Sequence, residues 1–437
     1  GNVCTYKFQN TEHSKLKEIL WTDCSTAQEV LKRLVSDMRD NILHKYGVDT
    51  LITVELLSWF MPFQFKIGNY LCHKVCPEVL ILGDTRVGKS TTAKDLAVHF
   101  GAGRYVDCGA NATFVGLVGG NTELGSHRVF TWGVLPTSHR GHVTMDEANK
   151  LRLEVWGGLT NLKSSGRAER TTNTGARKTR SAVRLLTLCN PRGSRALGAY
   201  DSPLDAAIEV VGTPQDLARI DLLYVAWALK DISILNTFHE TNTVHSYTRE
   251  VARYHLKWAW ALDKKKIKFA SPEHVLIRAQ ELLNDLKGIR LVAASEAKFK
   301  IGRIAIAIAS LVYSYDHETD GVIILNEHVD MAYALLRHLY TEYTKGAGIK
   351  TGVIPESIIE LFNDVDDPKR LRILSTSDSW TQQDFIDIFG SKSAIDFKVQ
   401  AQLEHNLMTR RRNYFIPNEG FQDIIRDYVN VKLKERA

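Results

Sequence analysis

The chain has 437 residues, 44% of them hydrophobic and 24% charged, with a formal net charge of +6. This length has room for two or three domains, and the apolar fraction suits a globular protein with a sizeable core. No apolar run is long enough to span a bilayer and no secretory signal begins the chain, so we expect a cytoplasmic protein without membrane insertion. The chain begins Gly1-Asn2 and not with Met, which suggests either a tag scar or a cut in a longer chain and leaves a missing N-terminal domain open.

The first 50 residues are predicted to form a short helical segment. They are mostly polar, and Leu31, Leu34, Met38 and Ile42 recur at helical spacing. Nothing in this stretch points to chemistry, so a helical collar or linker is the expectation for residues 1–50.

A phosphate loop is predicted between a buried strand at residues 79–82 and a helix at residues 91–100. The intervening sequence matches G-x-x-x-x-G-K-[ST] at every fixed position. Its glycines turn backbone N–H groups toward phosphate oxygens, Lys89 reaches the β- and γ-phosphates, and the Ser90 hydroxyl ligates Mg²⁺. ATP and Mg²⁺ are therefore the expected cofactors, and the predicted nucleotide-binding residues are Gly83, Asp84, Thr85, Arg86, Val87, Gly88, Lys89, Ser90 and Thr91.

Two carboxylates end a later predicted strand at residues 142–147, in the form of a Walker B element. Asp146 is predicted to hold the Mg²⁺, and Glu147 to polarise the attacking water. Most Asp-Glu pairs after a strand are solvated strand ends. The phosphate loop that precedes this pair makes the catalytic interpretation specific.

A basic hairpin is predicted after the carboxylates. Opposed only by Glu169, seven basic residues share one stretch: Lys163, Arg167, Arg170, Arg177, Lys178, Arg180 and Arg184. Turn-forming residues at 171–176 favour a β-hairpin, and Arg177, Lys178 and Arg180 are predicted to grip nucleic-acid phosphates. A solvated, partly disordered loop is the alternative. The glycine-rich residues 109–120 suit a second projecting loop or hairpin.

Two further residues are candidates because of where they stand beside predicted strands. Asn190 ends the strand 185–190, where its amide can bond the γ-phosphate or the attacking water; shaping the turn before Pro191 is the alternative. Arg219 precedes a fifth apolar strand and is a candidate arginine finger for a neighbour's ATP, or else a solvated surface residue. Five strands alternating with helices predict a parallel, three-layer α/β domain over residues 51–230.

The C-terminal half is predicted to contain a helical lid and a small separate domain. Residues 231–345 have a helical pattern, and a glycine-containing linker follows. Residues 353–437 are interpreted as a winged helix, with helices at 380–390 and 393–406 and a basic wing at 410–417. Such modules bind DNA or protein, and both possibilities stay open here.

The order of these elements resembles the AAA+ ATPase core of minichromosome maintenance (MCM) helicases, in a compact form like those of mobile elements and phages. The resemblance covers about residues 50 to 350, and the predicted winged helix matches the family's C-terminal domain. Residues 217–223 are similar to the family's S-R-F-D-L-L motif, with Ala for Ser and Ile for Phe. The other matching stretches are residues 109–117, 131–135, 190–191 and 163–184, the last at the place of the pre-sensor-1 hairpin.

The resemblance implies an ATP-dependent DNA helicase or translocase of replication that acts on single-stranded or forked DNA. It implies a homo-oligomeric ring, hexameric in form, with each ATP held between two subunits. Arg219 and a sensor 2 residue would then reach the neighbour's nucleotide. Arg303 is preferred for sensor 2 over Lys300 and Lys298. The chain departs from the family at Gly88, where Ala is usual. The N-terminal oligosaccharide-binding-fold and zinc domain of cellular members is either absent or cut away.

Two other functional classes remain open. AAA+ ATPases that remodel proteins carry inserts at the same places, and the basic hairpin disfavours that class. An initiator could use ATP as an assembly switch and bind origin DNA without unwinding it. Glu147 disfavours this second class, because a switch does not need to polarise water.

Overall fold

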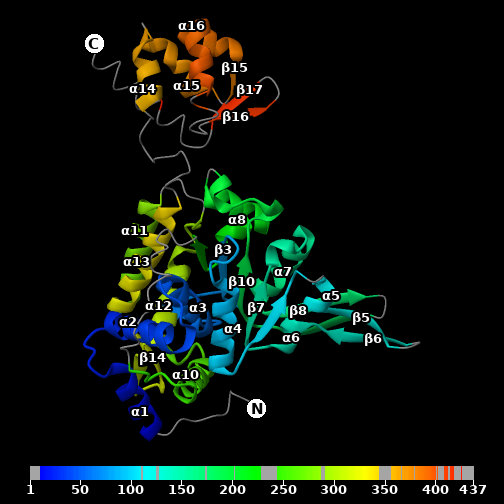
Figure 1. The fold of residues 1–437 in the computed structure, drawn as a ribbon, viewed down its shortest axis with the longest axis vertical. Helices are drawn as coiled ribbons and strands as arrows, with labels where there is room; N and C mark the ends of the chain where they lie inside the picture. The colour runs from blue at the N-terminus through cyan, green and yellow to red at the C-terminus, as the bar shows by residue number, and fades with distance from the viewer. Residues whose placement is uncertain are drawn as a thin grey trace. The chain divides into compact units, whose positions relative to one another are not determined.

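The computed structural model describes residues 10–109, 112–124, 127–172, 175–200, 202–227, 244–286, 291–343, 356–365, 367–377, 379–399, 401, 408–411, 414–417 and 425. The chain divides into two compact units (Figure 1). The first contains Gly1–Leu197, Ala206–Asp285 and Arg290–Leu339, and the second contains Gly198–Asp205, Leu286–Ile289 and Tyr340–Ala437.

A five-stranded parallel sheet forms the centre of the first unit. Its strands are β3 (Glu78–Gly83), β4 (Arg104–Asp107), β7 (His142–Asp146), β10 (Arg184–Cys189) and β11 (Leu222–Ala226). They lie in the order β11-β3-β10-β7-β4, and every neighbouring pair is parallel. Strands β3 and β10 are buried at every position, as expected where helices cover both faces. The predicted parallel α/β architecture is confirmed, in a layout compatible with a phosphate-loop fold.

Helix α3 (Asp49–Phe60) lies in the core of this unit. It packs against strands β3 and β10 and against helices α4 (Lys89–Phe100) and α12 (Ala297–Leu311). From Leu51 onward, all but one of its residues are buried, because its sequence is apolar on every side. Helix α7 (Leu153–Ser165) follows β7. Helices α8 (Pro203–Val211) and α9 (Pro214–Ala218) come between β10 and β11 in the chain.

The predicted N-terminal helices are present as α1 (Asn10–Trp21) and α2 (Ala27–Met38), followed by one π-helical turn at Arg39–Leu43. They belong to the same compact unit as the sheet and do not form a separate collar. Asp37 of α2 explains part of this attachment. Its carboxylate accepts hydrogen bonds from the backbone N–H groups of Ser246 and Tyr247, at 2.9 and 2.7 Å.

The region predicted as a helical lid is helical with an added small sheet. Its described helices are α10 (Arg249–Ala261), α11 (Pro272–Asp285), α12 and α13 (Asn326–Glu342). Strands β12 (Ile267–Phe269), β13 (Tyr315–Asp316) and β14 (Gly321–Ile324) form a three-stranded sheet that the sequence pattern did not reveal. Residues 231–243 and 344–345 of the predicted lid, and the linker after it, lie outside the described residues.

Two β-hairpins project from the same side of the first unit (Figure 1). One pairs β5 (Gly119–Leu124) with β6 (His127–Trp132), between the short helices α5 (Phe114–Leu117) and α6 (Val134–Thr137). The other pairs β8 (Arg167–Thr172) with β9 (Gly175–Arg180), and it confirms the predicted basic hairpin. Strand β5 contacts β8, so the two hairpins lie side by side. The turn residues 173–174 lie outside the described part.

The second unit has its own core. It contains α14 (Glu356–Asn363), α15 (Arg372–Thr376) and α16 (Gln382–Lys398). Strands β15 (Trp380–Thr381), β16 (Met408–Arg411) and β17 (Tyr414–Pro417) form an antiparallel sheet in the order β15-β17-β16. Gly390, with φ of 79°, breaks α16 at the predicted turn. Residues 402–406 of the predicted second helix and 412–413 of the predicted wing lie outside the described residues. Among the helices that the structure describes in either unit, none combines the length and apolar character needed to span a bilayer.

Candidate nucleotide site

The phosphate loop lies between β3 and α4, at the carboxyl edge of the parallel sheet. Gly88 has φ of 89°, which favours glycine, and a Cβ on Gly83 would lie 2.4 Å from the carbonyl oxygen of Ala226 on the adjacent strand. Both glycines of the motif are therefore required by backbone geometry. A cavity of about 360 Å³ opens there, and its lining is Thr85, Arg86, Val87, Gly88, Lys89, Ser90, Thr91, Asp146, Glu147, Leu188, Cys189 and Asn190.

Lys89 is buried, and three oxygen atoms surround its ammonium group. Its Nζ donates to the carbonyl oxygens of Gly83 and Asp84 at 2.8 and 2.7 Å, and to Oδ1 of Asn190 at 3.0 Å. Burial lowers the pKa of Lys89 to about 8. The structure therefore brings together the predicted phosphate-contacting lysine, at the start of α4, and the predicted γ-phosphate sensor, which follows β10.

Both predicted Walker B carboxylates line the same cavity. Asp146 ends β7, and its Oδ1 accepts the backbone N–H of Glu147 at 2.9 Å. Glu147 adopts φ of 51°, which is uncommon for a residue with a side chain, and its carboxylate pairs with Lys150 at 2.5 Å. A Cβ on Gly109 would lie 1.9 Å from Oε2 of Glu147, so this glycine leaves room for the carboxylate.

Two residues that the sequence did not single out complete this arrangement. Asn149 accepts the backbone N–H of Asn190 through Oδ1 at 3.2 Å and so joins the Walker B turn to the end of β10. Tyr105 on β4 donates its hydroxyl to Oδ2 of Asp146 and lies beside Ser90. Burial and the neighbouring Asp146 raise the pKa of Tyr105, which keeps the hydroxyl protonated. Both residues are placed by contacts between elements that are distant in the sequence, so no local motif marks them.

The oxygen atoms of Ser90 and Asp146 fit a single Mg²⁺ ion. Both residues line the same cavity, and the phenol of Tyr105 bonds Asp146 and lies beside Ser90, so the two side chains can approach one ion. A hydroxyl and a carboxylate are the hard oxygen ligands that Mg²⁺ takes, together with phosphate oxygens and water. Within the described residues, no group of three or more His, Cys, Asp or Glu side chains is placed to hold a metal. The protein would thus supply two ligands, and phosphate and water the remainder.

A buried carboxyl group, that of Glu55, lies close to this site. Glu55 of α3 is fully buried, and neither of its carboxylate oxygens has a hydrogen-bond partner in the described structure. Burial raises the pKa of Glu55 well above its ordinary value, while the nearby cations Lys45 and Lys89 oppose that shift. Burial therefore favours the protonated, neutral form of Glu55.

Arg219 lies at the opposite edge of the sheet from the phosphate loop. It precedes β11, whose residue Leu222 pairs with Val79 near the start of β3, while the loop follows the end of β3. A strand of five or six residues is roughly 17–20 Å long, so Arg219 does not reach the phosphate loop of its own chain. Its side chain is 57% exposed and pairs with Asp216 at 3.5 Å.

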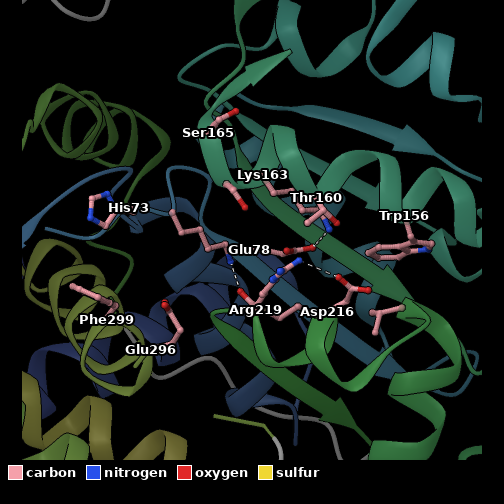
Figure 2. Close-up of a pocket in the computed structure, with 14 residues that line it drawn as sticks. His73, Glu78, Trp156, Thr160, Lys163, Ser165, Asp216, Arg219, Glu296 and Phe299 are labelled. Atoms are coloured by element: carbon pink, nitrogen blue, oxygen red, sulfur yellow. Dashed lines mark hydrogen bonds and ion pairs between the residues drawn. The ribbon is translucent and has the colours of Figure 1, made fainter. Parts of the chain in front are cut away.

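Figure 2 shows Arg219 and Asp216 in the wall of a separate cavity of about 420 Å³. Lys163 lines the same cavity, where its ammonium group pairs with Glu78 at 2.5 Å. The indole ring of Trp156 lies 4.7 Å from that ammonium group. This cavity is at the amino edge of the sheet, because Glu78 begins β3.

The structure does not bring Arg303 to either cavity. Arg303 is fully buried in α12, and its Nη1 bonds both carboxylate oxygens of Asp221 at 3.0 Å. Burial opposes ionisation of Asp221, but Arg303 and Lys74 outweigh it and lower the pKa of Asp221 to about 2. A guanidinium group held in this way is unavailable to a phosphate. The interpretation of Arg303 as sensor 2 therefore does not fit this structure, because its side chain is fully buried and its guanidinium group is held by Asp221.

The other two sensor 2 candidates differ in exposure. Lys300 is buried, and its amine donates to the carbonyl oxygen of Ile220; burial lowers the pKa of Lys300 to about 7. Lys298 is only partly buried, and its ammonium group lies 4.0 Å from the ring centroid of Tyr70. Lys298 is therefore the most accessible of the three.

The predicted DNA-contacting residues are exposed on strand β9 of the basic hairpin. Arg177 lies over the ring of Phe130 at 4.9 Å, and Arg170 of β8 lies over Phe114 at 4.7 Å. Lys178 pairs with Glu169 across the hairpin at 2.5 Å. That pair is exposed, and breaking it costs little free energy. The two hairpins together thus present arginine and lysine side chains interleaved with aromatic rings.

No model of a known protein family matches this chain, and no curated protein matches it. The chemistry of the site is therefore inferred from its own side chains. A buried lysine, two carboxylates, a serine hydroxyl and a carboxamide converge around one cavity. These are the groups that bind and hydrolyse a phosphoanhydride in phosphate-loop enzymes.

Proposed function

We propose that this protein is an AAA+ ATP hydrolase that acts as a DNA helicase or translocase. The observation that carries the proposal is the convergence of the phosphate loop, Asp146, Glu147 and Asn190 at one edge of the parallel sheet. The strand order favours it too, because β10 lies between the phosphate-loop strand and the Walker B strand. Asn190 can then reach the terminal phosphate from the middle of the site.

Each residue has one role in the proposed hydrolysis. Lys89 binds the β- and γ-phosphates, and Asn190, already bonded to Lys89, orients the terminal phosphate. Ser90 and Asp146 hold Mg²⁺, which neutralises charge on the phosphates when bound. Glu147 leaves Lys150, orients the attacking water and accepts its proton.

We propose that a second copy of the chain completes each site. Arg219 lies at the edge of the sheet away from the phosphate loop, and its guanidinium group is exposed. It can therefore approach the nucleotide of a neighbouring copy, where a positive charge stabilises the transition state. A closed homo-oligomeric ring, hexameric as the resemblance implies, lets every copy both give and receive this residue. Lys298, the most accessible of the three candidates, replaces Arg303 as the proposed sensor 2 residue.

The basic hairpin is the proposed DNA grip. Arg177, Lys178 and Arg180 are exposed on a strand that is paired in a β-hairpin. Such a surface binds phosphates without base preference and with strong salt dependence. Residues 231–345 remain the proposed lid, and the antiparallel sheet and helices of the second unit are proposed to form a winged helix that contacts DNA or a replication partner.

Two variants test the hydrolase step. Lys89→Ala is expected to abolish binding of a fluorescent ATP analogue, and Glu147→Gln is expected to retain binding while losing hydrolysis. Lys268→Ala, at an exposed lysine of the small lid sheet, is the matched control and should behave as wild type. A Lys89→Ala protein that still binds and hydrolyses ATP would contradict the proposed site.

A further inference from the structure

Tyr105 links the two sides of the candidate metal site. It lies on the edge strand β4 and pairs in register with Thr144 of β7. Asp146 is two residues further along β7, on the same face of the sheet, so the ring reaches it diagonally. Ser90 belongs to the first turn of α4. One phenol hydroxyl therefore meets a residue of the Walker B strand and a residue of the phosphate loop.

The contacts of Tyr105 fix its hydroxyl in place. The hydroxyl donates to Oδ2 of Asp146 and lies beside Ser90. The ammonium group of Lys94, one helical turn after Ser90, lies 4.7 Å from the ring centroid. The other oxygen of Asp146 accepts the N–H of Glu147 at 2.9 Å. Both oxygens of this carboxylate are thus held, and its orientation is set before any ion binds.

We infer that Tyr105 is a positioning residue that sets the affinity of this site for the divalent cation bound with ATP. The inference rests on the proposed function, since it assigns Ser90 and Asp146 as the ligands. A hydroxyl that holds the Asp146 carboxylate in a fixed orientation beside Ser90 lowers the cost of ordering these ligands around an ion. Outer partners of metal ligands typically change metal affinity by about 10- to 100-fold when they are removed.

Tyr105→Phe removes the hydroxyl and keeps the ring. The experiment titrates Mg²⁺ into protein with a fluorescent ATP analogue and compares nucleotide affinity with and without EDTA. Tyr105→Phe is expected to keep the metal-free affinity and to raise the half-saturating Mg²⁺ concentration by about 10-fold or more. Excess Mg²⁺ should restore binding. Tyr254→Phe, at an exposed tyrosine of α10, should leave both values unchanged.

The results separate this inference from the proposed function. Wild-type protein with Mg²⁺-dependent binding, together with an unchanged Mg²⁺ requirement in Tyr105→Phe, would overturn the role of Tyr105 alone. Wild-type protein that binds no nucleotide would overturn both. Thermal melting checks that the variant is folded. Lys94→Ala, which removes the cation above the ring, should shift the Mg²⁺ requirement in the same direction and provides the test if Tyr105→Phe does not fold.

Discussion

Asp221 lies at the amino end of β11 and is buried among cations. Arg303 bonds both of its oxygens, Lys74 donates to Oδ2 at 2.7 Å, and the N–H of Glu78 donates to Oδ2 at 2.8 Å. Replacing Asp221 by Asn keeps the shape of the side chain and removes its charge. The guanidinium group of Arg303 and the nearby amine of Lys300 would then lack their buried counter-charge. We expect this change to destabilise the first unit strongly.

Two independent estimates give the magnitude. The pKa of Asp221 is about 2 in the fold against 3.8 ordinarily, and at about 1.4 kcal/mol per unit the ionised form contributes roughly 2 to 3 kcal/mol at pH 7. Removing one partner of a buried ion pair costs about 3–5 kcal/mol. We therefore expect Asp221→Asn to lower the free energy of unfolding by roughly 3 kcal/mol. Because the folded pKa is depressed, this stabilisation is present above about pH 4 and is lost as the pH falls toward 2.

Urea unfolding at pH 7 and at lower pH measures this effect. The difference between wild type and Asp221→Asn should be largest at pH 7 and shrink as the pH falls toward 2. Glu318→Gln is the control, because Glu318 pairs with Lys268 on the surface, at 77% and 48% exposure, and should show no measurable change. An Asp221→Asn protein as stable as wild type would refute the reasoning. Arg303→Met with normal stability and impaired hydrolysis would return Arg303 to the nucleotide site.

Three further outcomes are expected. The raised pKa of Glu55 makes the wild-type protein lose stability as the pH rises. Glu55→Gln should therefore be more stable than wild type by a margin that grows from pH 5 to pH 8, by at most about 1.4 kcal/mol per pH unit. Thermal melts that show a constant margin would contradict this. Arg219→Ala and Lys89→Ala should each lack hydrolysis, and mixing the two proteins should restore part of it, whereas a mixture without recovery counts against shared sites. Replacing Arg177, Lys178 and Arg180 together with Ala should spare basal hydrolysis and reduce the salt slope of single-stranded DNA binding by roughly 2, measured by fluorescence anisotropy; loss of basal hydrolysis would instead indicate a structural hairpin.

The residues that the sequence identified are those whose chemistry constrains a short local pattern. The phosphate loop needs glycines at two backbone positions, and a lysine and serine directly after them, so residues 83–90 are recognisable without a structure. The carboxylates at the end of β7 and the basic hairpin were found for the same reason. Each lies within one element or one turn.

The residues that the sequence missed depend on contacts between distant elements. Tyr105 meets Asp146 through strand register, and Asn149 meets Asn190 across two turns that are 41 residues apart. The preference for Arg303 as sensor 2 does not fit this fold, because the sequence alone does not show that Asp221, 82 residues away, holds the guanidinium group in a buried ion pair. The short strands β12 to β14 carry too few residues for a period-2 pattern to be distinguished.

The most direct test of the proposed function is the rate of ATP hydrolysis with and without single-stranded DNA, over a salt series, beside unwinding of a forked duplex. We expect single-stranded DNA to stimulate hydrolysis, the stimulation to fade as salt rises, and the duplex to be unwound only when ATP and Mg²⁺ are present. Robust hydrolysis that is indifferent to DNA, with no unwinding, would contradict the helicase proposal and would favour an ATPase that remodels proteins.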